Sequence, residues 1–418
     1  MFSHIGRILC LSSALVITLS AASYPGISPD DWAGWRGPTH NGIARPGQNP
    51  PTAWDEEKNV SWKTKIPGRG HASPTVVGDF VYLPTADESA ETQSVVCLNR
   101  HTGEIVWATE LNQGGFDDDG HQRKSFASPT IACDGERLFV NLLNHGAVHT
   151  TALDLQGKKL WQKKISSFIT HQGYGASPFL YEDLVIVSSD NKGGGAIVGM
   201  KRDTGETVWR HERPQEPNYV SPVVYHLDGK DQLLLSGCNL MTSLNPKTGE
   251  TFWEFPGSTT ECVVTIVTDG ERVFSSGGYP KNHTLAMKAD GSGEIAWQNA
   301  TRVYVPSMIV HDQHAYAVAD AGFAICWESA TGKELWKERL GGDFFSSPIY
   351  SDGLIYATNI RGLTYVYRAA PDKFEIIAKN QLGNESYASP VICHNQVFLR
   401  VAHIDEQREE FIYCIAQP

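Results

Sequence analysis

Aromatic and charged side chains recur just before a Ser-Pro pair along this chain. Ser-Pro followed by an apolar stretch begins at positions 73, 128, 177, 221, 347 and 389, with weaker versions at Val263 and Pro306. Two positions before the serine or its equivalent stand His71, Phe126, Gly175, Tyr219, Glu261, Tyr304, Phe345 and Tyr387, with Tyr174 beside Gly175. Two positions further back stand Arg69, Lys124, Arg302, Asp343 and Glu385. Aromatic faces with a few charges can bind a flat ligand, a sugar or an extended peptide.

Two interpretations of these aromatics stay open, because the same rings could instead pack one structural unit against the next. The sequence offers little for catalysis: it has no CxxC, CxxCH, HExxH, phosphate loop or nucleophile elbow. "FDDDGHQ" (116–122) clusters three carboxylates with His121 but lacks the alternating spacing of a calcium loop, so we predict a solvated turn. His171 is predicted to be a structural histidine. We therefore predict no catalytic residue and no metal ligand.

The elements that must position these residues come from a repeat. Glycine stands four residues before tryptophan in six segments, which end at Trp107, Trp161, Trp209, Trp253, Trp297 and Trp336 and are spaced 39 to 54 residues apart. Between them, short β-rich runs are separated by DG, ED or TG turns. Eight units of this length, each forming a four-stranded antiparallel sheet, predict an all-β, eight-bladed β-propeller. Each tryptophan is predicted to wedge two neighbouring blades together.

The last blade lacks its final strand. The missing strand is predicted in "NVSWKTKI" (59–66), where Trp62 lies 45 residues ahead of Trp107. An N-terminal strand paired with the C-terminal strands would close the ring and remove an exposed sheet edge. The seventh blade departs from the pattern, and Ile377 is predicted to stand where its tryptophan would be.

Aligning the units also predicts the state of the cysteines. One column accepts only small or slim residues, namely Cys97, Ala152, Gly199, Ser243, Ala286, Cys326, Val366 and Cys414. Equivalent positions in different blades should lie farther apart than the roughly 7 Å Cα separation that a disulfide tolerates. These cysteines are therefore predicted to be buried thiols.

The N-terminal region divides into two predicted segments ahead of the propeller at residues 59–418. Residues 1–22 carry Arg7, an apolar run and small residues at the end, which is typical of a secretory signal peptide. Cys10 comes too early to be a lipoprotein cysteine, and an uncleaved anchor is the alternative. Residues 23–58, rich in Pro and Gly, are predicted to form an irregular strap pinned by Trp32, Trp35 and Trp54, with a disordered linker as the alternative. The predicted location is periplasmic or secreted.

The charge restricts the partners. The formal net charge is −12, which disfavours nucleic acids and anionic membranes, although a local basic patch stays compatible with it. No later stretch is apolar enough to span a membrane. We expect a monomer whose partner is a cell-envelope protein, a small molecule or a sugar.

The unit SP…DG…VY…LN…TG…W resembles the repeat of pyrroloquinoline-quinone-type (PQQ-like) propellers over residues 59–418. The resemblance implies two classes of relative: PQQ- and calcium-dependent dehydrogenases, and non-catalytic propellers such as the subunit of the outer-membrane β-barrel assembly machinery. This chain has neither the adjacent-cysteine pair of many alcohol-oxidising members nor a haem motif, and calcium ligands and a catalytic aspartate find no matching positions.

These observations together favour an exported binding or scaffold propeller without catalytic function. The alternative is a quinoprotein oxidoreductase acting on alcohols or sugars, with PQQ and calcium as cofactors. In a propeller the loops before each Ser-Pro gather at one mouth of the central channel. The predicted ligand-binding residues are therefore Arg69, His71, Lys124, Tyr174, Tyr219, Glu261, Arg302, Tyr304, Asp343, Phe345, Glu385 and Tyr387.

Overall fold

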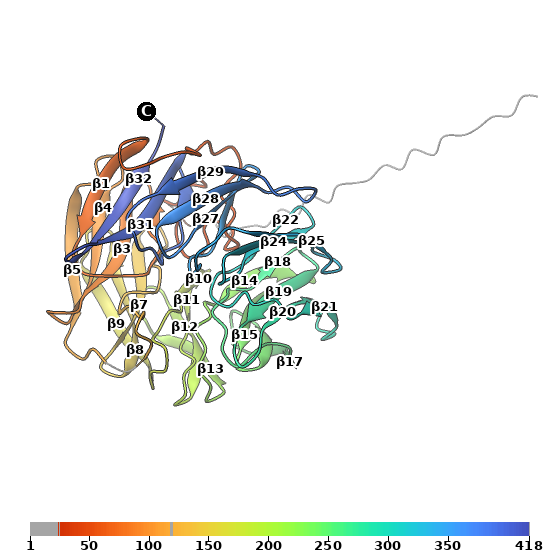
Figure 1. Ribbon diagram of the computed structural model, residues 1–418. Coiled ribbons are helices and arrows are strands. Elements are labelled where there is room, and N and C mark those ends of the chain that lie inside the picture. The colour runs from red at the N-terminus through yellow and green to blue at the C-terminus, as the bar shows by residue number, and fades with distance from the viewer. Residues whose placement is uncertain (1–23, 25, 118–119, 418) are drawn as a thin grey trace, which may run out of the picture.

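The chain folds as a ring of eight four-stranded antiparallel sheets, as the sequence predicts (Figure 1). The computed structural model describes residues 24, 26–117 and 120–417. The predicted signal peptide, residues 1–22, lies outside them. Among the described residues, there is no helix with the length and apolarity to cross a bilayer.

The first four blades follow one another along the chain, and within each blade the strands pair in sequence order. They are formed by β2 (Thr75–Val77), β3 (Phe80–Asp87), β4 (Thr92–Asn99) and β5 (Ile105–Gln113); β6 (Ala132–Cys133), β7 (Arg137–Asn144), β8 (Ala147–Asp154) and β9 (Lys159–Ser167); β10 (Phe179–Tyr181), β11 (Leu184–Ser188), β12 (Gly195–Lys201) and β13 (Thr207–Arg213); and β14 (Val223–Leu227), β15 (Lys230–Gly237), β16 (Leu240–Leu244) and β17 (Thr251–Pro256).

The next three blades repeat this order, and the eighth is shared between the two ends of the chain. Their strands are β18 (Val267–Thr268), β19 (Arg272–Gly277), β20 (His283–Lys288) and β21 (Ile295–Asn299); β22 (Ile309–His311), β23 (His314–Val318), β24 (Phe323–Glu328) and β25 (Glu334–Arg339); β26 (Ile349–Ser351), β27 (Leu354–Thr358), β28 (Leu363–Arg368) and β29 (Ile376–Gln381); and β30 (Val391–Cys393), β31 (Gln396–Ile404) and β32 (Arg408–Ile415) with β1 (Val60–Ile66).

The N-terminal strand closes the ring. Strand β1 pairs antiparallel with β32 and places Trp62 opposite Cys414, the register that Trp107 and Cys97 have in the first blade. Figure 1 shows β1 lying beside the C-terminal strand. The prediction of N-terminal closure is therefore confirmed.

The predicted tryptophan wedge has a specific partner in the next blade, namely the glycine of its turn. A Cβ added at Gly249 would lie 2.5 Å from the Trp209 ring, and one added at Gly103 would lie 2.6 Å from the Trp62 ring. The indole N–H also reaches across, since Trp209 Nε1 donates to the carbonyl of Pro246 at 3.1 Å. The Gly-x-x-x-Trp repeat thus links neighbouring blades, because five of its six glycines leave room for the preceding blade's tryptophan; the sixth, Gly293, faces the Phe255 ring instead.

This contact can be tested with two glycines of equal φ. Gly249 and Gly229 both have φ = 71°, but an added Cβ at Gly229 meets nothing within 4 Å. Gly229→Ala should cost about 1 kcal/mol for the left-handed backbone alone. Gly249→Ala should cost about 2 kcal/mol more, because the methyl group must displace the Trp209 ring. Urea unfolding measures both, and equal losses would contradict the wedge.

The small-residue column is confirmed, and one detail of the seventh blade is corrected. Seven of the eight members of the column lie opposite a tryptophan, Val366 being the exception, and a Cβ at Gly199 would lie 2.3 Å from the Trp209 ring. The seven described cysteines are all free and buried. In the seventh blade, Val366 pairs with Ala378, so the prediction that Ile377 takes the tryptophan position is wrong. Ile377 occupies the bulge and is 37% exposed.

The strap closes one end of the channel. It contacts all eight blades, through Trp32 on Val76, Ala33 on Cys133, His40 on Phe179 and Tyr225, Trp35 on Thr265, Arg36 on Met308 and Pro348, and Asn49 on Asn395. Trp32 and Trp54 are buried, as predicted, and Trp35 is half-buried. The strap's backbone bonds reach the innermost strands β2, β6 and β26. The bonded residues of these strands follow the Ser-Pro pairs in the chain, whereas the candidate loops precede them. The strap and these loops therefore lie at opposite ends of the innermost strands.

The strap should also make the fold sensitive to acid. Burial lowers the pKa of His40 to about 4, whereas an unfolded histidine titrates near 6.5. The unfolded chain therefore binds more protons below pH 6.5, and stability falls as the pH drops from 6.5 towards 4. Between pH 7 and 5 the loss assigned to His40 is about 2 kcal/mol. Denaturant titrations at pH 7 and pH 5 should show a smaller loss of stability for His40→Gln than for the wild type; an equal loss would contradict the assignment to His40.

Candidate functional site

Hydroxyl groups from the Ser-Pro repeat form a belt around the channel. The backbone N–H of one blade donates to the serine or threonine hydroxyl of the next, with distances of 2.8 to 3.2 Å. Seven of the eight junctions are made in this way, through the hydroxyls of Thr130, Ser177, Ser221, Ser307, Ser347, Ser389 and Ser73. At the eighth, next to Ser221, the Thr265 hydroxyl accepts Trp35 Nε1 at 2.7 Å. The belt therefore fixes where each loop before Ser-Pro starts.

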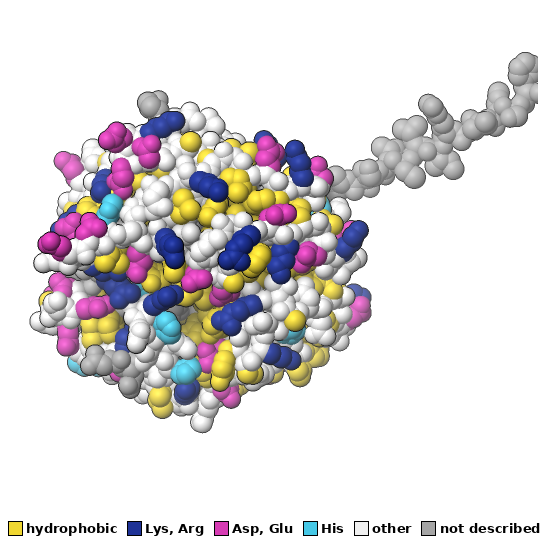
Figure 2. All heavy atoms as spheres, in the orientation of Figure 1, with side chains coloured by type: hydrophobic (Ala, Val, Ile, Leu, Met, Phe, Trp, Pro, Cys, Tyr) yellow, Lys and Arg dark blue, Asp and Glu magenta, His cyan; other side chains and the backbone are white. Residues whose placement is uncertain are grey.

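These loops surround a cavity of about 620 Å³. A cavity of this volume is in the range of small-molecule pockets. Nine of the twelve predicted residues line it, namely His71, Lys124, Tyr174, Tyr219, Glu261, Arg302, Tyr304, Phe345 and Tyr387. On the face seen in Figure 2, Lys and Arg side chains gather around hydrophobic side chains near the middle.

The other three predicted residues lie outside the lining. Arg69 pairs with Glu88 at 3.5 Å, and its backbone bridges to Ala86. Glu385 accepts a hydrogen bond from the Tyr387 hydroxyl at 3.1 Å and forms an ion pair with Arg408. Asp343 is exposed. Their spacing from Ser-Pro matches that of Lys124 and Arg302, but their side chains support or flank the wall instead of facing the cavity.

A buried carboxylate organises one wall of the cavity. Glu261 is 3% exposed, and its two oxygens are both used: Oε1 lies 3.0 Å from His171 Nε2, and Oε2 accepts the Tyr304 hydroxyl at 2.9 Å. Lys192 Nζ lies 2.9 Å from the other ring nitrogen of His171. Burial, with Glu261 as the second cause, raises the pKa of Tyr304. Tyr304 therefore stays protonated and keeps donating to Glu261.

The opposite wall is aromatic. The rings of His71 and Tyr387 lie 4.2 Å apart, and those of Tyr387 and Phe345 lie 5.8 Å apart. Burial lowers the pKa of His71 well below its ordinary value, so this ring is neutral. The wall is therefore an uncharged set of ring faces and edges.

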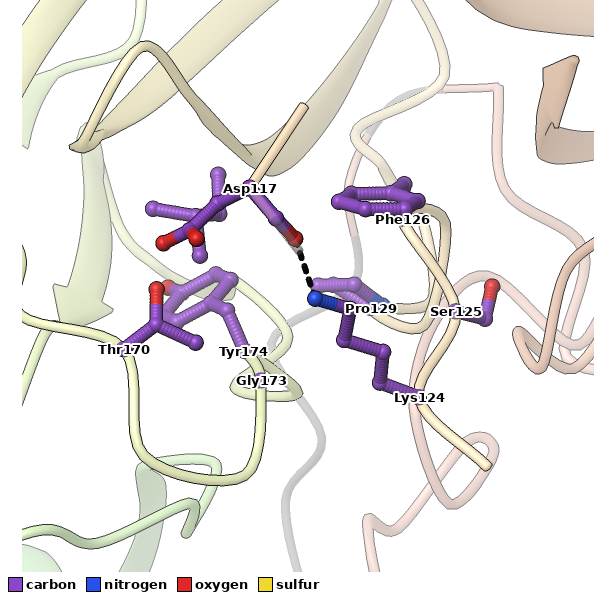
Figure 3. A pocket seen from close by; sticks show the side chains of 9 residues that line it. Asp117, Lys124, Ser125, Phe126, Pro129, Thr170, Gly173 and Tyr174 are labelled. Atoms are coloured by element: carbon purple, nitrogen blue, oxygen red, sulfur yellow. Dashed lines mark hydrogen bonds between the residues drawn. The ribbon is translucent and has the colours of Figure 1, made fainter. Parts of the chain in front are cut away.

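Phe126 belongs to a second, much smaller cavity of about 20 Å³, the size of one water molecule. Its ring stacks on Phe116 at 4.0 Å. Figure 3 shows Phe126 and Tyr174 on either side of Lys124, whose ammonium donates to the Asp117 carbonyl. Tyr174 also donates to the Ser188 carbonyl at 2.8 Å. The packing interpretation therefore holds for Phe126 and Tyr174, although Tyr174 borders both cavities.

Several lining residues were missed by the sequence analysis. Trp35 enters from the strap, Arg123 precedes the predicted Lys124, and Asp320 accepts the Tyr304 backbone N–H at 2.6 Å. His171, which the sequence predicts to be a structural histidine, lines the cavity. Its Nε2 lies within hydrogen-bonding distance of Glu261, 90 residues away in the chain. Only the position of Arg123, next to the charged column, gave a signal that could have identified it.

The fold and the mouth cavity define the class: an eight-bladed propeller built from PQQ-like repeats. The chain belongs to the family described as outer membrane protein assembly factor BamB, whose model matches residues 91–322 and 281–372.

Individual relatives come from both branches of PQQ-like propellers. The outer membrane protein assembly factor BamB of Burkholderia pseudomallei (strain K96243) is 25% identical over 347 residues, which cover 78% of this chain and 81% of that protein. A polyvinylalcohol dehydrogenase from Pseudomonas sp. is 24% identical over 253 residues, 56% of this chain but 37% of the enzyme. Both relatives fit the resemblance seen in the repeat.

Solved structures match over most of the chain. BamB from Moraxella catarrhalis superposes with a TM-score of 0.61 at 14% identity, covering 84% of this chain and 96% of that one. A europium-containing methanol dehydrogenase superposes with a TM-score of 0.67 at 11% identity, covering 93% and 98%. At these identities the matches show the shared fold alone.

Proposed function

We propose that this protein is an exported, non-catalytic binding propeller of the cell envelope, which captures its ligand in the mouth cavity. The observation that carries the proposal is the cavity of about 620 Å³, which combines aromatic walls with a small number of fixed charged groups. Such a combination binds and orients a ligand. The membership in a family of outer membrane assembly factors supports a role in the envelope, as does the signal-peptide pattern of residues 1–22.

The arrangement of the titratable groups supports binding over catalysis. Both oxygens of Glu261 are occupied by His171 and Tyr304, and Tyr304 is held in its protonated form. A substrate proton would have to share or displace one of these contacts to reach a Glu261 oxygen. The cavity carboxylate is instead used to hold two loops in place.

A thermal-shift screen of sugars, organic acids and short peptides tests the proposal. A ligand that binds the folded state alone raises the melting temperature, by an amount set by its concentration relative to Kd. We expect at least one of these classes to raise the melting temperature, and to do so in proportion to the logarithm of its concentration. No shift in any class at millimolar concentration would contradict capture of a small ligand.

A quinoprotein oxidoreductase is the second candidate, favoured by the polyvinylalcohol dehydrogenase relative. Its calcium ion would need several oxygen ligands. Among the described residues, no three His, Cys, Asp or Glu side chains are grouped to hold a metal, and the cavity carboxylates Glu261 and Asp320 are both bonded to Tyr304. The donor set therefore does not fit calcium, and we derive no reaction through PQQ.

A further inference from the structure

The charged side chains that line the mouth cavity differ in how many hydrogen bonds and ion pairs they already make with the protein. Among the described residues, the lining contains two carboxylates, Glu261 and Asp320. Glu261 is buried and doubly bonded, with Lys192 behind its partner His171. Asp320 accepts the Tyr304 backbone N–H, and burial raises its pKa. Both carboxylates of the described lining are therefore already engaged in hydrogen bonds with protein groups.

The cations of the same lining are positioned on aromatic faces. The Arg302 guanidinium lies 5.0 Å from the centroid of the Tyr304 ring and makes one hydrogen bond, to the Gly278 carbonyl at 3.3 Å. The Arg123 guanidinium lies 5.6 Å from the centroid of Phe345. Over the described residues, it has no hydrogen bond or ion pair besides this contact. By contrast, the buried Arg213 and Arg400 are each paired with a carboxylate.

The contact between Arg123 and Phe345 joins loops of two blades that are not neighbours. Arg123 lies in the connection between β5 and β6, which leads into the second blade. Phe345 precedes β26, the first strand of the seventh blade, so their contact reaches past the first and eighth blades. The contact with the Phe345 ring uses none of the five N–H donors of the guanidinium as hydrogen-bond donors to a described residue. The planar fork of these donors matches two oxygens of a carboxylate or sulfonate.

We propose that the mouth cavity selects a small organic anion with a flat ring, whose anionic group binds Arg123 and whose ring contacts the His71, Tyr387 and Phe345 wall. This inference rests on the proposed binding function and adds the charge of the ligand. The formal net charge of −12 repels anions at long range, so the preference arises locally, within the cavity.

Two fluorescent probes with the same ring system test the charge preference. Both 8-anilinonaphthalene-1-sulfonate and N-phenyl-1-naphthylamine carry an anilinonaphthalene skeleton, but the sulfonate is present in the first alone. Wild-type protein is expected to bind the sulfonate about tenfold more tightly, the effect of one charge-assisted hydrogen-bonded pair. Arg123→Gln should remove this difference and leave the affinity for the neutral probe within about twofold.

Matched variants separate the proposal from general effects of losing an arginine. Arg339 has its guanidinium 5.3 Å from the Phe323 ring on the outer strand β25, so Arg339→Gln removes a similar cation–aromatic contact outside the cavity. This variant should keep the wild-type preference. Arg123→Lys should retain part of it, because the charge remains but the bidentate fork is lost.

The outcomes distinguish the charge preference from the binding function itself. Equal affinity of wild-type protein for both probes, or an unchanged preference in Arg123→Gln, would overturn the anion proposal while leaving the cavity as a binding site. Absence of binding by either probe would overturn both. Binding that is unchanged in both Arg123→Gln and Gly175→Trp, which places an indole in the cavity, would place the probes elsewhere and also overturn the anion proposal.

Discussion

Asp190→Asn is expected to lower the free energy of unfolding by about 3 kcal/mol, because the buried Arg213 charge keeps Glu254, a more distant and partly exposed carboxylate at 3.7 Å, as its one remaining ion-pair partner among the described residues. The side chains of Asp190 and Arg213 are both fully buried, and their oxygens and nitrogens lie 3.3 to 3.4 Å apart. An arginine keeps its proton even when buried. The substitution therefore removes the buried one of the two carboxylates that face Arg213, while the volume of the side chain stays nearly the same.

The effect should extend to the mouth cavity. Asn218 donates to Asp190 at 3.0 Å and accepts the backbone N–H of Cys262 at 3.1 Å. Its chain neighbour Tyr219 and Glu261, the neighbour of Cys262, both line the cavity. Asp190 thus holds the loops that carry two of the predicted binding residues.

Chemical denaturation measures the free energy of unfolding of Asp190→Asn, and Glu206→Gln is the control variant. Glu206 pairs with Lys201 in the same blade at 2.7 Å, but both side chains are exposed. Loss of an exposed pair should change the stability little, because solvent screens it. A cost for Asp190→Asn no greater than for Glu206→Gln would show that the buried pair contributes little to the fold.

Gly175→Trp is expected to abolish ligand capture while preserving the fold. Gly175 lines the cavity, an added Cβ there meets nothing within 4 Å, and its φ is outside the left-handed region. A side chain can therefore be added without backbone strain, and the indole would occupy space that the ligand needs. Affinity for any cavity ligand should fall by about 100-fold or more, as measured by titration.

The control for this variant is Val106→Trp. Val106 lies in the outermost strand of the first blade and is 51% exposed, so the same indole is added away from the channel. Its ligand affinity should equal that of the wild type. A ligand that binds Gly175→Trp as tightly as the wild type would have to sit outside the cavity, against the proposed site.

The sequence predicted the fold in detail because each blade repeats the same local signals. Gly249 and Trp253 occur at a fixed spacing whose sister copies give the blade count, and Trp62 gives the closing strand. The prediction for the seventh blade was wrong because this blade lacks the Thr-Gly turn from which the position of the bulge is counted. Ala378, and not Ile377, is the residue equivalent to the tryptophans of the other blades.

The site was predictable as far as it follows the repeat. Tyr219, Tyr304 and Tyr387 share one repeat position, and all three reach the cavity. The contact of His171 with Glu261 forms because two loops meet across the mouth. The repeat pattern does not predict which loops meet, so this contact could not be predicted from the sequence. Trp35 reaches the cavity through the irregular strap, whose path is fixed by packing on all eight blades and not by any local pattern.

The central claim is that this propeller binds a ligand in its mouth cavity without catalysing a reaction of its own. The most direct test is an absorption titration of purified protein with PQQ and calcium, followed by a dye-linked oxidation assay over alcohols and sugars. PQQ is itself a flat ring with carboxylates, so its binding alone does not indicate catalysis. We predict no substrate-dependent dye reduction above the cofactor-only control. A saturable quinone spectrum accompanied by substrate-dependent dye reduction would contradict the account and make the protein a quinoprotein oxidoreductase.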